Sequence, residues 1–200
     1  MKRTPLKRKT PLKSKSGLST KTPLQKSGKR TKSTKTQLTS PSWFKAIPKS
    51  AGHGAGDEQK RLWRLVTDYC RIRDWYQYDG KCVATGQYFD NWKLLQGGHY
   101  IEYTKCNVLF KFDVRNIHAQ SPTSNKFDDK NTTGYKFGRE LERRYGAGYI
   151  EMLWKENEKH KGGKFYAVDI VAYAERVLNL MEQLPEKPDY YEKVQRLRTS

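Results

Sequence analysis

The chain reads QGGHY at residues 96–100, VLFKF at residues 108–112 and NIHAQ at residues 116–120, and these three runs decide the fold that we expect. His99 closes the first strand-like run, and the second strand-like run follows it. The third run is polar and could open a helix. This order predicts a small sheet in the middle of the chain, with polar side chains converging beside it.

Segments with helical periodicity lie on both sides of this stretch. Asp57 and Glu58 suit the positive amino end of a helix, and the apolar residues that follow recur at three- and four-residue spacing. The members of this stripe are Leu62, Leu65, Val66, Tyr69, Ile72, Trp75 and Tyr76. Further helices are predicted at about residues 133–145, around residues 149–154 and at about residues 165–184. The pattern therefore predicts an α+β fold in which helices flank the sheet.

The positive charge is concentrated at one end of the chain. Lys and Arg number 40 against 21 acids, which gives a formal net charge of +19. Residues 1–50 hold 15 of these bases and no acid, so the remaining 150 residues carry 25 bases against 21 acids. Frequent prolines prevent a helix in residues 1–50. These residues also have too little apolar surface to offset the loss of conformational entropy on folding. We expect a disordered basic arm in which the Trp43-Phe44 pair alone could dock on the folded part.

Three parts are therefore expected along the chain. Residues 1–56 form the basic arm and a linker, residues 57–146 form the core, and residues 147–200 form a C-terminal helical extension. No run of about 18 apolar residues predicts a membrane span, and the amino end lacks the apolar segment of a secretion signal. Three cysteines cannot form a full disulfide framework, which favours the reducing cytoplasm.

The arm predicts a polyanionic partner, and nucleic acid suits it best because each neutralised phosphate releases a condensed counterion. An anionic membrane surface would require an apolar anchor beside the charge, and the arm has only single leucines between basic residues. A solubilising tail is the simpler alternative. The basic residues expected to contact DNA are Lys7, Arg8, Lys9, Lys13, Lys29, Arg30 and Lys32.

The polar residues of the central stretch suit the cleavage of a phosphodiester. This reaction needs a base to activate water and a cation to neutralise charge on the phosphate. His99 is the candidate base because imidazole titrates near neutrality, and Asn116 could hold the loop in place. Asn125 and, less directly, His118 are candidate metal ligands. The alternative is that His99 and His118 are core histidines with satisfied hydrogen bonds.

Residues 80–95 have the composition of a turn-rich hairpin, and residues 81–87 have the outline of a metal knuckle. Such a knuckle needs a second thiolate at the position of Thr85. A neutral hydroxyl is a poor zinc ligand. We therefore expect this loop to fold without the metal.

The pattern from residue 57 to residue 146 resembles the lambdoid phage NinG (Rap) recombination endonuclease family, whose site is an HNH-type ββα-metal (His-Me finger) fold. The matching positions are Cys82, Gly86, Gly98, His99, Tyr100, Phe112, Asn116, His118, Gln120, Asn125, Asn131, Tyr135 and Leu141. The resemblance implies a phage recombination endonuclease that cuts branched DNA with Mg²⁺ or Mn²⁺. It also implies His99 and Asn116 as catalytic residues, and the cytoplasm of a host bacterium as the compartment.

The chain departs from the family pattern at four positions. Thr85, Ser121 and Ser124 stand where the family has zinc-binding cysteines, and one remaining thiolate cannot hold a structural zinc, so zinc is predicted to be absent. Gln96 stands where the family can carry an acid. Two alternatives therefore stay open: a non-catalytic DNA-binding protein on a degenerate scaffold, and an RNA-binding or ribosome-associated basic protein.

Deleting residues 1–50 should weaken the binding of duplex DNA and flatten its dependence on salt. Each contacted phosphate contributes about −0.9 to the slope of log K against log salt, so losing several contacts changes the slope by several units. Binding titrations at several salt concentrations check this. A slope that does not change after truncation would mean that the arm does not touch DNA.

Overall fold

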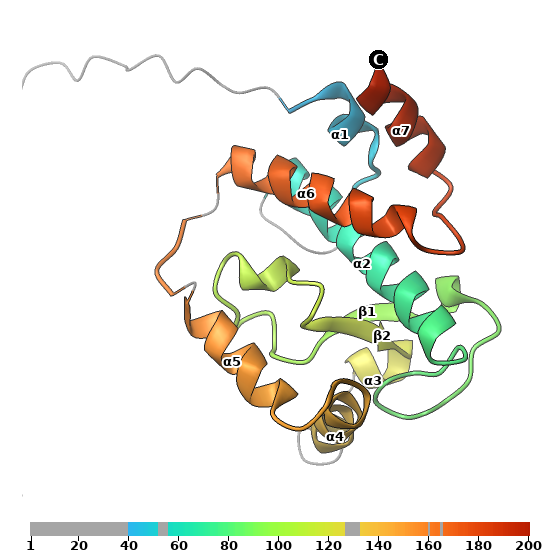
Figure 1. Ribbon diagram of the computed structural model, residues 1–200, viewed down its shortest axis with the longest axis vertical. Helices are drawn as coiled ribbons and strands as arrows, with labels where there is room; N and C mark the ends of the chain where they lie inside the picture. The colour runs from blue at the N-terminus through green and yellow to red at the C-terminus, as the bar shows by residue number, and fades with distance from the viewer. Residues whose placement is uncertain (1–39, 52–55, 127–132, 160, 165) are drawn as a thin grey trace, which may run out of the picture. The chain divides into compact units, whose positions relative to one another are not determined.

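The computed structural model describes residues 40–51, 56–126, 133–159, 161–164 and 166–200. All of them belong to one compact unit, Gln37–Ser200. The described elements are α1 (Ser42–Ala46), α2 (Asp57–Gln77), η1 (Trp92–Leu94), β1 (Gln96–His99), η2 (Phe110–Phe112), β2 (Ile117–Gln120), α3 (Pro122–Lys126), α4 (Thr133–Tyr145), α5 (Tyr149–Lys159), α6 (Ala167–Glu182) and α7 (Tyr191–Thr199) (Figure 1). Helices therefore surround one small antiparallel sheet, as an α+β fold requires.

Helix α2 lies at the centre of this arrangement, with α6 on one side and the two strands on the other (Figure 1). Its predicted start at Asp57 is confirmed, and the apolar stripe from Leu62 to Ile72 is buried. Tyr76, predicted to lie on the same stripe, is instead exposed. The helix is buried on two opposite sides because the sheet and α6 both pack on it, so its burial is wider than one stripe.

Two hydrophobic cores hold the unit together. The first combines side chains of α1, α2, α6 and α7, among them Leu65 and Leu178. The second combines residues 82–84 with Ile101, Phe110 and side chains of α4 and α5. Side chains from all three predicted parts of the chain thus meet in the first core, and side chains from the second and third parts meet in the second core. The predicted boundaries at residues 56 and 146 divide the sequence, but they do not divide the packing.

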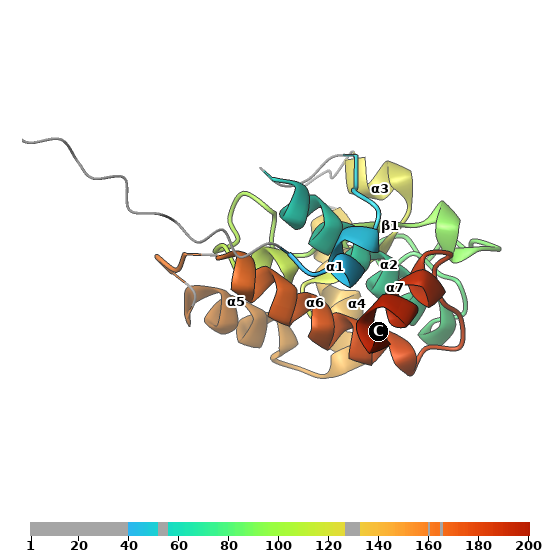
Figure 2. The same ribbon diagram turned by 90° about the horizontal axis from the view of Figure 1, so that it is seen from above.

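The expected docking of the Trp43-Phe44 pair is confirmed. Both side chains and Ile47 are buried in the first core, and α1 lies beside α7 (Figure 2). Arg61 of α2 donates hydrogen bonds to the carbonyl oxygens of Lys45 and Ile47, which fixes the end of α1. A truncation at residue 50 would therefore remove part of a core, whereas a truncation at residue 39 leaves Trp43, Phe44 and Ile47 in place.

The second strand differs from the sequence-based prediction. It is β2, residues 117–120, and not residues 108–112, which form a loop with the short η2 helix. Phe110 packs in the second core and Phe112 packs in the first. Residues two apart in a strand point to the same face, so a strand could not place these side chains in different cores, whereas the 3-10 turn does. β2 was expected to be polar and helical, yet all four of its residues are buried: His118 pairs with Asp74, and the side chain of Gln120 lies against Gly98.

The helices after the sheet largely confirm the periodicity. α4 has the predicted bounds, α5 occupies Tyr149–Lys159, and α6 occupies Ala167–Glu182 within the longer predicted range. Helix α7 was not predicted; it buries Tyr191 and Val194 against the first core. Among the helices of the described segments, none has the length and apolar character to cross a membrane.

Candidate functional site

The two strands set the positions of the candidate residues. β1 and β2 pair antiparallel, with Gly98 opposite His118. Successive residues of a strand point to opposite faces of the sheet. Gly97 and His99 therefore share one face, and Gln96 and Gly98 share the other.

Both glycines of β1 are points of close approach. A Cβ atom on Gly97 would lie 2.8 Å from Cγ2 of Thr67, which belongs to α2. A Cβ atom on Gly98 would lie 2.5 Å from Cδ of Gln120 and 2.7 Å from Oδ1 of Asn125. Any larger residue would push these neighbours away. The first face is thus covered by α2, and the second face carries Gln120 and Asn125.

His99 lies half-buried at the end of β1 and is held by two kinds of contact. Its ring stacks on Trp63 of α2, with centroids 4.9 Å apart and planes inclined by 9°, and Tyr103 meets it edge-on. Its Nε2 atom lies 2.8 Å from the carbonyl oxygen of Lys111. A carbonyl oxygen only accepts hydrogen bonds, so Nε2 carries the hydrogen in the neutral ring and Nδ1 holds the lone pair. A ring nitrogen that keeps its lone pair is able to accept a proton.

Asn116 fastens the loop that follows His99. Its buried Oδ1 accepts a hydrogen bond from the backbone N–H of Ile101 at 2.8 Å, and its Nδ2 donates to the carbonyl oxygen of Ile101 at 3.1 Å. The backbone carbonyl of Asn116 also accepts from the N–H of Tyr100. These bonds bridge the two ends of the loop between the strands. The side chain contacts backbone, so it acts on the position of His99.

Three amide side chains gather on the opposite face of the sheet. Asn125 of α3 donates from Nδ2 to Oε1 of Gln96 at 2.9 Å, and Gln120 and Asn125 both lie against Gly98. Among the described residues, no group of three or more His, Cys, Asp or Glu side chains could hold a metal ion. Amide oxygens are hard ligands without charge. They fit a weak Mg²⁺ site whose negative charge comes from substrate phosphates.

His118 has a structural position. It is fully buried, its Nε2 lies 3.0 Å from the carbonyl oxygen of Arg115, and its Nδ1 lies 3.2 Å from both Asp74 and Arg73. Burial lowers the pKa of His118, although Asp74 opposes this shift. A metal ion would have to break one of these contacts. The expectation that His118 ligates a metal is therefore replaced by a role in the core.

The residues at the four positions where the family has zinc-binding cysteines, Cys82, Thr85, Ser121 and Ser124, form a hydrogen-bonded cluster. The Sγ atom of Cys82 lies 3.5 Å from Oγ of Ser124 and accepts from the N–H of Ser121 at 3.2 Å. Ser121 donates from its hydroxyl to Ser124 at 2.9 Å. Burial would raise the pKa of the Cys82 thiol, but hydrogen bonds from Ser124, Thr85 and Ser121 lower it. Three hydroxyls and one thiol do not fit a zinc site.

Some contacts that position the site were not visible in the sequence. Trp63, Lys111 and Asp74 belong to elements distant in the chain from the residues they hold. The Lys111 contact uses a backbone carbonyl, which every residue has, so no sequence signal could have revealed it. The seven basic residues expected to contact DNA, from Lys7 to Lys32, lie outside the described residues.

Comparison with known proteins gives one match. A family model described as Bacteriophage Lambda NinG protein matches residues 7–183 of the chain. The comparisons with curated proteins and with solved structures found no match. The matched range extends beyond residues 57–146, on which the resemblance was recognised, into the arm and through α6.

The free energy of unfolding should decrease as the pH falls from 7 to 5. Burial lowers the pKa of folded His118, so the unfolded state takes up a proton near pH 6.5 before the folded state does. Each pH unit in that window costs up to about 1.4 kcal/mol. Urea denaturation at pH 5, 6, 7 and 8 measures this slope.

The His118→Gln variant provides the control for this titration. Its side chain does not titrate, so the difference in stability between wild type and variant should shrink as the pH falls. A difference that stays constant would show that folding does not shift the pKa of His118, and a difference that grows as the pH falls would show that folding raises it.

Proposed function

The chain belongs to the bacteriophage lambda NinG family, a family of phage recombination-related proteins, and we propose that it is an endonuclease that cuts branched DNA. The observation that carries the proposal is the state of His99. Its ring is fixed between Trp63 and the carbonyl oxygen of Lys111, with the lone pair on Nδ1. Catalysis by proton transfer requires such a positioned base near neutral pH.

We propose further that the core is an HNH-type ββα-metal fold. The order of elements supports this, since β1 ends in His99, a long loop follows, and β2 leads directly into α3. Asn116 closes the loop by its bonds to Ile101. Asn125 is placed by α3 on the sheet face that also carries Gln96.

In the proposed reaction, Nδ1 of His99 accepts a proton from a water molecule that attacks the scissile phosphorus in line with the leaving oxygen. The resulting positive charge on the ring is stabilised by the Nε2–H bond to the carbonyl of Lys111. Trp63 restricts the rotation of the ring, so the lone pair keeps one direction. Asn116 contributes by holding the loop, and its effect on the rate is indirect.

A divalent ion, Mg²⁺ or Mn²⁺, would neutralise charge on the phosphate and the leaving oxygen when bound. Asn125 is the residue we propose to hold it, with Gln96 and Gln120 beside it. All three are neutral amides, so the site would be completed by phosphate oxygens of the DNA. Metal affinity without DNA should therefore be weak.

A second candidate function is DNA binding without cleavage. Gln96 favours this alternative, because an amide at this position adds no charge for a divalent ion. The basic arm would then supply affinity on its own. The two functions differ in one measurement, since only the nuclease requires His99.

The His99→Gln variant should lower the rate of DNA cleavage by about a hundredfold or more, which is the usual scale for removing a general base. Glutamine can still donate a hydrogen bond to the carbonyl of Lys111 but takes no proton from water. Cleavage and binding of the same junction DNA are measured in one buffer. Affinity should stay nearly constant, because it depends on phosphate charges.

Thermal melting of His99→Gln and His99→Ala gives the control for this test. Alanine removes the stacking on Trp63 and should lower the melting temperature more than glutamine does. If glutamine reduces cleavage, binding and melting temperature together, His99 is a core histidine and the proposed base is wrong.

The Gln96→Glu variant should increase metal-dependent cleavage and tighten Mg²⁺ binding. Glutamate keeps an oxygen that accepts from Nδ2 of Asn125 and adds the charge that a divalent ion favours. Cleavage rates as a function of Mg²⁺ concentration give the apparent affinity. Gln183→Glu, at the exposed end of α6, makes the same charge change elsewhere and should leave the Mg²⁺ dependence unaltered.

A further inference from the structure

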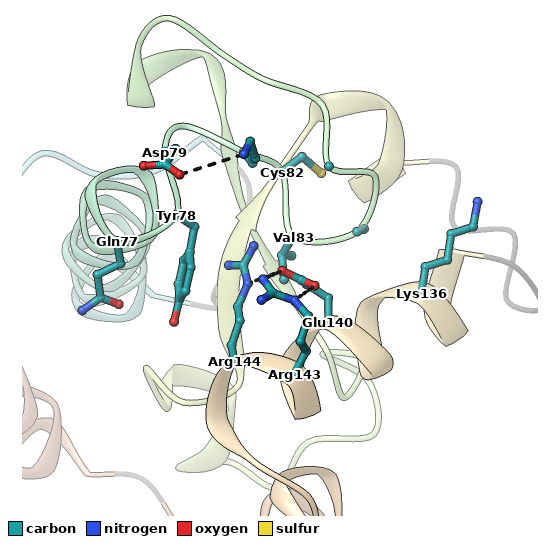
Figure 3. A pocket seen from close by; sticks show the side chains of 12 residues that line it. Gln77, Tyr78, Asp79, Cys82, Val83, Lys136, Glu140, Arg143 and Arg144 are labelled. Atoms are coloured by element: carbon teal, nitrogen blue, oxygen red, sulfur yellow. Dashed lines mark hydrogen bonds and ion pairs between the residues drawn. The ribbon is translucent and has the colours of Figure 1, made fainter.

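A pocket of about 570 Å³ lies between α4 and the segment of residues 77–86, and it shares no lining residue with the His99 site (Figure 3). Four basic side chains line it and two acids accompany them, so its walls carry a net positive charge. The basic residues are Lys81, Lys136, Arg143 and Arg144, and the acids are Asp79 and Glu140. Such a composition suits an anionic ligand.

The basic side chains of α4 occur at the spacing of one helix face. Lys136, Glu140, Arg143 and Arg144 follow one another at intervals that place them on adjacent turns. Figure 3 shows them on the side of α4 that faces the 77–86 segment. Three basic side chains and one acidic side chain of α4 therefore line the same wall of the pocket.

Arg144 is held rigidly, with part of its hydrogen-bonding capacity unused. Its Nε donates to Oε1 of Glu140 at 2.7 Å, and its guanidinium carbon lies 3.6 Å from the ring centroid of Tyr78. Its side chain is 3% exposed. Its buried Nη1 atom has no hydrogen-bond partner in the described part of the chain. A buried donor without an acceptor is unfavourable, so an acceptor that enters here would be bound.

Glu140 is shared between two arginines. Arg143 donates to both of its oxygens at 2.7 Å, and the bonds from Arg143 and Arg144 lower the pKa of Glu140 to about 2. The single negative charge of Glu140 is therefore shared by two positively charged guanidinium groups. On the opposite wall, Lys81 lies 3.9 Å from Asp79, and both of these side chains are largely exposed.

We propose that this pocket binds a phosphate group, which in the complex with DNA is a phosphate of the backbone. Arginine pairs with phosphate through parallel N–H bonds, and Arg143 is exposed enough to turn from Glu140 toward such a ligand. The inference that the phosphate belongs to the DNA backbone rests on the proposed function, because that function requires the protein to bind DNA. The pocket would fix one strand at a distance from the reacting phosphate.

The double variant Lys136→Ala/Arg143→Ala tests the pocket in the full-length chain. Both side chains are exposed, and the Arg143–Glu140 pair is a surface ion pair that adds little stability. Affinity for duplex and junction DNA should fall about tenfold or more in 0.1 M salt. The slope of log K against log salt should become less steep by about 0.9, which is the contribution of the one phosphate that the pocket no longer binds.

The matched control is Lys155→Ala/Arg196→Ala. It removes the same two charges from exposed positions on α5 and α7, which do not line the pocket. The decrease in log K for DNA should be less than half of the decrease caused by Lys136→Ala/Arg143→Ala. Equal losses in the two double variants would overturn the DNA proposal, because the effect would then be one of net charge.

Glu140→Gln gives a prediction of opposite sign. The amide releases the two arginines from a charged competitor, so the affinity for DNA should increase severalfold. Glu192→Gln, on the exposed surface of α7, makes the same charge change and should have a smaller effect. A pocket that is merely structural would lose stability in Glu140→Gln without gaining affinity, and this result would contradict the proposal.

Titration with inorganic phosphate distinguishes the source of the ligand. NMR resonances of the Arg143 and Arg144 Nε–H groups should shift with added phosphate in the wild type, and the Arg144 resonance should not shift in the double variant. If phosphate binds but the two double variants bind DNA equally, the pocket takes a free phosphate. If neither phosphate nor DNA perturbs these groups, the proposal is wrong. These readouts do not involve cleavage, so a protein that binds but does not cut refutes the nuclease alone.

Discussion

The carboxylate of Asp74 connects the central helix to the sheet, and the rest of the site depends on this connection. The group is fully buried at the end of α2. It accepts a hydrogen bond from the backbone N–H of Ala119 at 2.8 Å, pairs with Arg73 at 2.7 Å and faces Nδ1 of His118. Burial would raise the pKa of Asp74, but Arg73 and His118 lower it, so the group stays ionised. Removing one partner from such a buried pair typically costs about 3–5 kcal/mol.

The position of β2 on α2 then determines the position of β1 through the register of the two strands. His99 reaches Trp63 because Gly97 lets the strand approach Thr67. On the other face, Gly98 leaves the space that Gln120 and Asn125 occupy. One buried ion pair and two glycines thus place the candidate base and the candidate metal ligand on opposite faces of a sheet of two strands.

Much of the helical part of the fold could be predicted from the sequence, because apolar residues at three- and four-residue spacing indicate which face of a helix is buried. This applies to α2, α4, α5 and α6. The strands could not be predicted as well, since β2 buries the polar side chain of His118, whose partners Asp74 and Arg73 lie on α2. Residues 108–112 look like a strand because they are apolar, yet their two phenylalanines enter different cores. Such patterns depend on tertiary contacts that a local window does not contain.

The sequence predicted which residues form the candidate site, but it did not predict the contacts that hold them in position. The pattern around His99 and Asn116 pointed to both residues, but their partners are backbone atoms and a helix far along the chain. The spacing of His118 suggested a ligand, whereas the structure buries its ring beside Arg73 and Asp74. Where the family has zinc-binding cysteines, hydrogen bonds hold Cys82, Ser121 and Ser124 together.

The most direct test of the account is the incubation of the purified full-length protein with duplex, forked and four-way-junction DNA, in Mg²⁺ and in a chelator. A base fixed by Trp63 and Lys111, together with amides on the opposite face of the sheet that hold an ion only with phosphate, predicts cleavage of branched DNA that requires Mg²⁺ or Mn²⁺. Cleavage products should appear with the metal and be absent with the chelator. Tight binding without cleavage of any substrate, in either metal, would contradict the nuclease and leave a DNA-binding protein.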